Sequence, residues 1–598
     1  MKLPSLLFSS SVLTQRPPTS APTITRAAQR TFPPPLQPHA PLRRSDIAFY
    51  AAAAIGLLLR LDFIFAANPH DLTFHSGGSD SPSYVLLAQN LLHHLGFAYD
   101  GFPTAVRPPG YPLLLAAAMQ LFGAHYILAI RILQFALGLA TIAICANVAQ
   151  RLATPSALPA VPNSAANSGS PFAARSEGRS AYRAALLIGL FLPTLIFTTA
   201  QLLTECVAAF LTAIFLQNLV RQRQLADTRS AWLMGAAAGI ESMFRFNAAA
   251  LPIFAAAAVF ASSKPDIVRT ASATNSPVDA PSPHANRTIF ARSVAAGAAT
   301  SSANAIADGA AVGTSSILSF VGASSSLDPY RDRAGDGAQA AVPSPTTARP
   351  PSRALRLTLA LLLPLLIVSP WLLRNERAFH GQVLYSTQSG PNAVQGVLTS
   401  SGRTQPGDSE LLQKNLGWEL HQIETNSPTR ANLPGEAVLD RAALAIVPKL
   451  WAAQGLHAIP LLAKKLADFW LSADQLVYPE WLTRRVYPDW LARSGPTASL
   501  PQRERILRAA GVLSYWLVLA AALLGYTRLR HSHPAIATLF LLYASTITVL
   551  HLPLVMNTRL RIPLLDPLLV ILASQSFSHA PRQDTAVAPP RLSVVGAR

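Results

Sequence analysis

The chain has 598 residues, of which half are hydrophobic and only 13% are charged. Since a soluble domain has about a quarter charged residues, this composition excludes an ordinary water-soluble enzyme. The formal net charge of +19 would suit a nucleic-acid partner, but Lys and Arg stand mainly in short stretches between apolar runs, as in the inner loops of membrane proteins. We therefore expect a multi-pass membrane protein that binds no nucleic acid.

The N-terminal part of the chain predicts a tail followed by a membrane module. Residues 1–44 are rich in Pro, Ser and Thr and have no apolar core with a cleavage site, so we expect a disordered tail. Arg43 and Arg44 precede the first apolar run, which places the start of that span in the cytoplasm. Residues 45–262 are expected to form an N-terminal transmembrane catalytic module. Its predicted spans are residues 47–67, 126–149, 184–203, 206–219, 231–244 and 248–262.

The rest of the chain divides by composition. Residues 263–353 are a mixture of Ala, Ser, Pro and Thr without a period, which predicts a disordered cytoplasmic linker. The remaining predicted parts are a span within residues 354–373, an outer-facing periplasmic segment at 374–508, C-terminal spans (509–523, 534–550 and 563–573) within 509–577, and a cytoplasmic tail at 578–598. An amphipathic stretch broken at Pro460 is expected to lie against the membrane rather than cross it. The fold class is therefore an all-α polytopic membrane protein with about ten spans.

Five arginines depart from the positive-inside pattern, because this topology places them on the outer face. A planar guanidinium group suits phosphate and carboxylate, and contact with lipid head groups explains any single outer arginine equally well. All five together favour an anionic, phosphate-containing substrate at the outer membrane surface. They are Arg107, Arg245, Arg374, Arg559 and Arg561.

Asp80 is the candidate for acid–base chemistry. It precedes Ser81 and Pro82, which suit the cap and first turn of a helix at the water boundary. An ionised carboxylate there can accept a proton from an attacking hydroxyl or amine. The alternative is an aspartate that only caps a turn.

Other candidates lie at neighbouring outer positions. The motif "RPPGYP", residues 107–112, predicts a rigid elbow that holds its arginine in place. Glu205 follows an apolar span, where an acid is costly unless it is used, although it could merely cap its turn. Tyr84 and Tyr111 could stack on a sugar, and an aromatic belt at the membrane interface explains them equally well. The histidines of this loop match no metal motif, so we predict no metal ligands.

In their order and sidedness, these motifs resemble those of the bacterial branch of the GT-C glycosyltransferases. The closest grouping is glycosyltransferase family 39, related to the protein O-mannosyltransferases and to the aminoarabinose transferases that modify lipid A. The resemblance is carried by the outer loop with Asp80 and Tyr84, and then by "RPPGYPLLLAA", "LLTE", "RFNA", "PWLLRNE" and "RLRIPLLDPLL".

The resemblance implies a GT-C-like helical bundle with a catalytic first outer loop. The implied reaction moves a sugar, usually with inversion, from a polyprenyl-phosphate carrier to an envelope acceptor that is a lipid, protein or polysaccharide. It would occur at the periplasmic face of the bacterial inner membrane, among membrane lipids. Asp80 would be the general base, with Arg107 in the motif that follows it.

Arg245, Arg559 and Arg561 would be candidates for holding the carrier phosphate. Two departures from the family leave the sugar and the acceptor open. Ser81 stands where the mannosyltransferases have a second acid, and the Lys-Pro-Pro form of the aminoarabinose enzymes is absent. Whether a divalent cation assists is open as well.

The main alternative function is a transporter or flippase of a lipid-linked or anionic substrate. Transporters tend to have repeated halves and polar or helix-breaking positions near the middle of their spans. This sequence has no obvious repeat, and its polar residues gather at the outer ends of spans. A non-catalytic scaffold for envelope polymers would leave Asp80 and "RPPGYP" without a purpose. The pattern therefore favours an enzyme.

Overall fold

The computed structural model describes nine stretches of the chain. They are residues 44–66, 80–99, 101–154, 171–199, 201–262, 352–398, 435–471, 502–556 and 558–578. Nearly all of the N-terminal tail predicted at 1–44, of the linker predicted at 263–353 and of the C-terminal tail predicted at 578–598 lies outside these residues. The start of α1, up to Ala52, belongs to one compact unit, and Ala53–Arg598 form the other. All contacts discussed below lie within the second unit.

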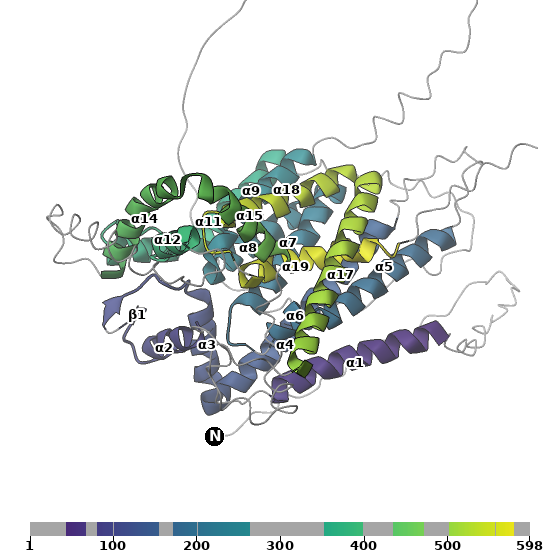
Figure 1. The fold of residues 1–598 in the computed structure, drawn as a ribbon, viewed down its shortest axis with the longest axis horizontal. Helices are drawn as coiled ribbons and strands as arrows, with labels where there is room; N and C mark the ends of the chain where they lie inside the picture. Colours follow the sequence, from purple (N-terminus) through teal and green to yellow (C-terminus); the bar gives the residue numbers. More distant parts are fainter. Residues whose placement is uncertain are drawn as a thin grey trace, which may run out of the picture. The chain divides into compact units, whose positions relative to one another are not determined.

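The described residues are mostly helical (Figure 1). The N-terminal helices are α1 (Arg44–Ala66), α2 (Ser81–Leu92), α3 (Gly110–Phe122), α4 (Tyr126–Ala153), α5 (Pro171–Phe191), α6 (Pro193–Phe197), α7 (Glu205–Leu225), α8 (Thr228–Phe244) and α9 (Leu251–Ala261). The later helices are α11 (Arg353–Ala378), α12 (Ser389–Leu398), α14 (Gly435–Gln454), α15 (Ala458–Leu471), α17 (Gln502–Ser532), α18 (Pro534–His551) and α19 (Thr558–Gln575). A short antiparallel hairpin, β1 (Ala98–Tyr99) with β2 (Phe102–Pro103), follows α2.

The expectation of an all-α polytopic membrane protein is confirmed. In the described part of the chain, five helical stretches are long and apolar enough to cross a membrane, and they are Gly110–Ala153, Arg353–Ala378, Gly435–Leu471, Ala510–Ser532 and Pro534–His551. Every predicted span coincides with a helix, but the span predicted at 184–203 was wrong in extent. Its helix, α5, ends at Phe191, and α6 begins at Pro193, because proline has no N–H to continue the helical bonding.

The apolar runs assign each helix end to the inner or the outer side, and the contacts described here join ends that were assigned to the same side. At the ends predicted to face inward, Arg356 donates to the Ala226 carbonyl at 2.9 Å, and Gln575 donates to the Ala149 carbonyl at 3.0 Å. At the ends predicted to face outward, Glu205 at the start of α7 pairs with Arg245 at the end of α8. Helix ends that are far apart in sequence but predicted to share a side therefore lie together.

Two packing features fix this bundle. Helix α19, shown in yellow in Figure 1, lies among α4, α5, α7 and α17 and is buried along most of its length. Helices α8 and α11 approach closely at Gly235 and Gly239, where an added Cβ would lie 2.3 Å from the Leu359 carbonyl oxygen and 2.8 Å from Pro364 Cα, respectively. Two small residues four apart commonly permit such contact between membrane helices.

The stretch Gly435–Leu471 contains most of the amphipathic segment, residues 450–475, that was expected to lie along the membrane with a break at Pro460. The break is instead the 3₁₀ turn Gly455–His457, and Pro460 lies in the first turn of α15, where proline is tolerated. Length and composition would let this stretch cross a membrane. However, Glu436 bonds Ala105 at one end, and Lys465 bonds Leu552 at the other. Both partners lie on the predicted outer side, which favours our original expectation.

Candidate active site

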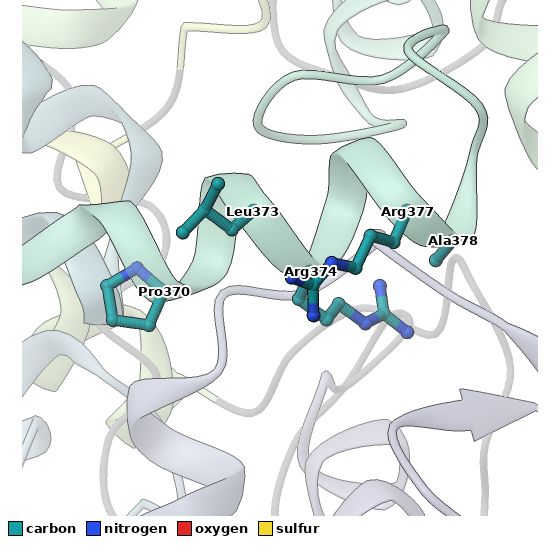
Figure 2. Close-up of a pocket in the computed structure, with 5 residues that line it drawn as sticks. All are labelled: Pro370, Leu373, Arg374, Arg377 and Ala378. Atoms are coloured by element: carbon teal, nitrogen blue, oxygen red, sulfur yellow. The ribbon is translucent and has the colours of Figure 1, made fainter.

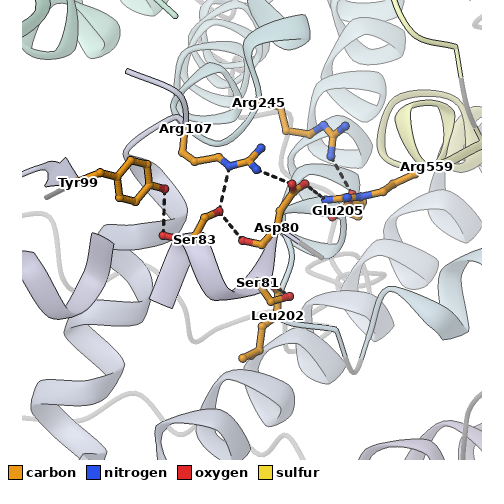
Figure 3. A network of polar contacts seen from close by, with 9 residues as sticks. All are labelled: Asp80, Ser81, Ser83, Tyr99, Arg107, Leu202, Glu205, Arg245 and Arg559. Atoms are coloured by element: carbon orange, nitrogen blue, oxygen red, sulfur yellow. Dashed lines mark hydrogen bonds and ion pairs between the residues drawn. The ribbon is translucent and has the colours of Figure 1, made fainter. Parts of the chain in front are cut away.

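Pro82 lies in the first turn of α2, as the sequence predicted, but the N-cap position is Asp80 rather than Ser81, because the helix begins one residue earlier than expected. The Asp80 side chain makes no capping hydrogen bond, so the alternative of a simple cap does not describe it. The neighbouring Ser81 hydroxyl donates to the Leu202 carbonyl at 3.1 Å and ties the start of α2 to the segment before α7. The Asp80 carboxylate is thereby left to face a group of arginines (Figure 3).

Each oxygen of Asp80 pairs with a different guanidinium group. Arg107 Nη2 lies 2.5 Å from Oδ1, and Arg559 Nη2 lies 2.6 Å from Oδ2. Arg107 is itself held, because its Nε donates to the Ser83 hydroxyl at 3.1 Å and its guanidinium lies 5.4 Å from the centroid of the Tyr84 ring. The "RPPGYP" elbow therefore presents its arginine to Asp80.

Glu205 is the second carboxylate of the cluster. It is 1% exposed, and its Oε1 pairs with Arg245 Nη1 at 3.2 Å and accepts a hydrogen bond from Arg559 Nε. Arg245 also donates to the Thr204 hydroxyl at 3.0 Å. Arg559 thus bonds both carboxylates, and the three arginines outnumber the two acids. The cluster, defined as Asp80, Arg107, Glu205, Arg245 and Arg559, carries a net positive charge.

The protonation state of Asp80 follows from these partners. Burial alone would raise the pKa of Asp80, but the neighbouring Arg559 and Arg107 outweigh burial and hold this pKa below its ordinary value. The carboxylate is therefore ionised at neutral pH. An ionised carboxylate within a positive cluster can accept a proton once its arginines are drawn to another anion.

The helical segment that precedes Glu205 is broken at Pro193. Pro193 cannot donate to the Gly189 carbonyl, and Arg60 Nη2 replaces the missing donor at 2.7 Å. Arg60 is fully buried in α1 and also bonds the carbonyls of Leu190 and Leu195, at 3.3 and 3.2 Å. Sequence reasoning missed Arg60, although a charged residue in the middle of an apolar span was a visible signal.

Tyr111 supports the segment that leads to Glu205 through Gln134. It is fully buried, and its hydroxyl donates to Gln134 Oε1 at 2.8 Å. Gln134 Nε2 in turn donates to the Gln201 carbonyl at 2.7 Å, four residues before Glu205. Tyr84 is 4% exposed and packs edge-to-face on Tyr111. Neither ring is open for stacking on a sugar in this structure, and both brace the cluster instead.

The remaining predicted arginines lie elsewhere. Arg561 is fully buried, donates to the Phe469 carbonyl at 2.7 Å and pairs with Asp566 at 3.3 Å, so the structure does not bring it to Asp80. Arg374 donates to the carbonyls of Thr104 and Phe97, at 2.8 and 2.6 Å.

Arg374 also borders a hollow of about 510 Å³ on one side of α11 (Figure 2). The hollow is lined by Pro370, Leu373, Arg374, Arg377 and Ala378, and not by the cluster. Across the described stretches, no group of three or more His, Cys, Asp or Glu side chains could hold a metal ion.

Comparison with known proteins gives only a distant likeness. No family model matches the chain, and no curated protein matches it significantly. Two crystal structures of ArnT from Cupriavidus metallidurans, one bound to undecaprenyl phosphate and one in the apo state, are similar at 14% identity and a TM-score of 0.29. Each match covers 89% of this chain and 77% of that chain. Such a score does not establish a shared fold, so the chemistry is inferred from the contacts of the cluster.

Proposed function

We propose that this chain is an inverting glycosyltransferase of the GT-C type. It would move a sugar from a polyprenyl-phosphate carrier to an envelope acceptor on the periplasmic face of the bacterial inner membrane. The observation that carries the proposal is the pairing of the two Asp80 carboxylate oxygens with Arg107 and Arg559, in a cluster with more arginines than acids. The helix ends that form this cluster are those predicted to face outward.

Asp80 would act as the general base. Its carboxylate takes the proton of an acceptor hydroxyl or amine as the acceptor atom forms a bond to the anomeric carbon of the sugar. The bond between that carbon and the phosphate oxygen breaks, and its electron pair leaves with the phosphate. A single displacement from the face opposite the leaving group inverts the anomeric centre. The products are the glycosylated acceptor, the polyprenyl phosphate and a proton on Asp80.

The arginines would bind the phosphate and stabilise its developing charge. Two buried atoms of the cluster have no hydrogen-bond partner among the described residues: Nε of Arg245, a donor, and Oε2 of Glu205, an acceptor. A buried unpaired donor beside excess positive charge suits a phosphate oxygen. A phosphate would also compete with Asp80 for Arg107 and Arg559. As these arginines turn to the phosphate, the carboxylate becomes a stronger base, so donor binding prepares the proton acceptor.

The test is turnover of radiolabelled polyprenyl-phosphate sugars by membranes that contain the wild type or Asp80→Asn. Asp227→Asn is a matched control, because Asp227 also pairs with an arginine, Arg221, but at the opposite helix ends. Transfer or donor hydrolysis lost only in Asp80→Asn supports the enzyme. Equal turnover in all three removes Asp80 from the mechanism. Movement of the intact donor across the membrane, without transfer, would support the transporter instead.

A further inference from the structure

The loop that carries Arg107 is held by residues from a distant part of the chain. Glu436, in the first turn of α14, accepts a hydrogen bond from the Ala105 amide at 2.7 Å and another from the Thr104 hydroxyl at 2.7 Å. Thr104 is 1% exposed and Ala105 is fully buried. These two residues belong to the loop shortly before Arg107.

The same two residues make further bonds with the end of α11 and with the segment that follows it. Arg374 donates to the Thr104 carbonyl at 2.8 Å, and the Thr387 amide donates to the Ala105 carbonyl at 3.2 Å. The Thr387 hydroxyl donates to Glu436 Oε1 at 3.1 Å. The Glu436 carboxylate thus accepts three hydrogen bonds, two from the loop and one from a residue that itself bonds the loop.

An apolar contact supports this anchoring. Ala105 belongs to a buried cluster with Trp371, Phe379, Val383 and Ala437, and the last of these directly follows Glu436. The loop is therefore seated on the outer segment by packing as well as by hydrogen bonds. Because hydrogen bonds to an ionised group are stronger than those between neutral groups, Glu436 and Arg374 are the two strong polar contributors to this seat, and of the two only Glu436 bonds both Thr104 and Ala105.

We infer that Glu436 is a positioning residue that sets the place of Arg107 in the active site. Only Val106 separates Ala105 from Arg107, and the Val106 amide is itself held by the Thr104 hydroxyl at 3.2 Å. A shift at Thr104 and Ala105 is therefore passed on to Arg107 through a single residue. Arg107 would then lose its 2.5 Å contact with Asp80. The effect on catalysis rests on the function proposed above. The dependence of the loop and of Arg107 on Glu436 does not.

Amide hydrogen exchange in the full-length protein tests whether Glu436 anchors the loop before Arg107. In Glu436→Ala, exchange of the peptide that spans residues 97–107 should accelerate by about tenfold, while the peptides of α4 and α7 keep their rates. Glu436→Gln should show a smaller increase, because its amide oxygen can still accept from Ala105. Arg441→Ala, an exposed change on the same helix, is the control. Unchanged exchange in Glu436→Ala would overturn the inference.

A double-mutant cycle tests whether Glu436 acts through Arg107. The measured quantity is the affinity of each variant for undecaprenyl phosphate. Glu436→Ala should weaken binding by about tenfold in the wild type but by less than about twofold in an Arg107→Ala background, because residues that act through one another are not additive. An equal loss in both backgrounds would show that Glu436 does not act through Arg107. If the wild type fails to bind undecaprenyl phosphate, the proposed donor is wrong, and the exchange experiment still decides the role of Glu436.

Discussion

Arg559 joins Asp80 to Glu205: its Nη2 lies 2.6 Å from Asp80 Oδ2, and its Nε donates to Glu205. This bridge needs the planar, multiply donating guanidinium group. A lysine keeps the charge but is a compact point donor that cannot reproduce the fork. We therefore expect Arg559→Lys to lower kcat/KM by about 100-fold, which corresponds to about 2.7 kcal/mol of transition-state stabilisation.

Arg221→Lys is the control for Arg559→Lys. Arg221 pairs with Asp227 at 3.2 Å on the other side of the bundle, and this partly exposed pair contributes little. Its activity should stay within about twofold of the wild type. Full activity in Arg559→Lys would show that the bridge between the two carboxylates is not needed for catalysis.

The arginines also predict a pH dependence. Burial raises the pKa of Asp80, whereas Arg559 and Arg107 lower it, and the net pKa lies below the ordinary value. The acidic limb of kcat/KM in the wild type should therefore lie below about pH 4. Arg107→Ala removes one of the lowering charges, so the pKa of Asp80 rises and the limb moves to higher pH. A pH–rate profile of both proteins measures the shift.

The lowered pKa of Asp80 also predicts how the free energy of unfolding changes with pH. Because the native pKa is lowered, ionised Asp80 stabilises the fold fully above its unfolded pKa of about 4, and this contribution disappears as pH falls through the native pKa. In Arg107→Ala this contribution to the free energy of unfolding should be smaller, so the variant should unfold more easily at neutral pH.

An acidic limb of kcat/KM that does not move in Arg107→Ala would mean that Asp80 is not the group whose ionisation limits the rate.

Much of the cluster was predictable, because topology brings its members together. Asp80, Arg107, Glu205, Arg245 and Arg559 come from separate parts of the chain, yet each was placed at an outer helix end by the alternation of apolar runs. Arg561 does not join the cluster, for a local reason. Each residue turns an α-helix by about 100°, so a residue two positions after Arg559 points to nearly the opposite face of α19.

Other parts of the site carried weaker signals. The helix break at Pro193 was visible as a proline within an apolar run, but the sequence does not say which side chain would bond the freed carbonyls. Glu436 gave no signal, since its partners Thr104 and Ala105 are brought to it only by tertiary packing. Periodicity and charge locate helix ends, whereas contacts between loops depend on how the whole bundle assembles.

Arg60 and Pro193 should be coupled energetically. Arg60→Met keeps much of the side-chain volume but leaves the carbonyls of Gly189, Leu190 and Leu195 without this donor, and an unpaired buried acceptor costs about 1–3 kcal/mol. We expect a large loss of thermal stability in detergent. Pro193→Ala restores an N–H that can reach Gly189, so it should recover part of the stability in the Arg60→Met background. No recovery would mean that Arg60 acts through other contacts.

The approach of α8 to α11 gives a final prediction, independent of the chemistry. A Cβ at Gly235 would lie 2.3 Å from the Leu359 carbonyl oxygen, and backbone cannot move aside as a flexible side chain can. Gly235→Ala should therefore push the helices apart and cost about 1–3 kcal/mol, although alanine favours a helix over glycine by about 1 kcal/mol. Gly435→Ala is the matched control, since no atom of the described residues lies within 4 Å of its added Cβ. Thermal unfolding in detergent should show a lower midpoint for Gly235→Ala only. Equal midpoints for both variants would show that α8 and α11 are not in the close contact described.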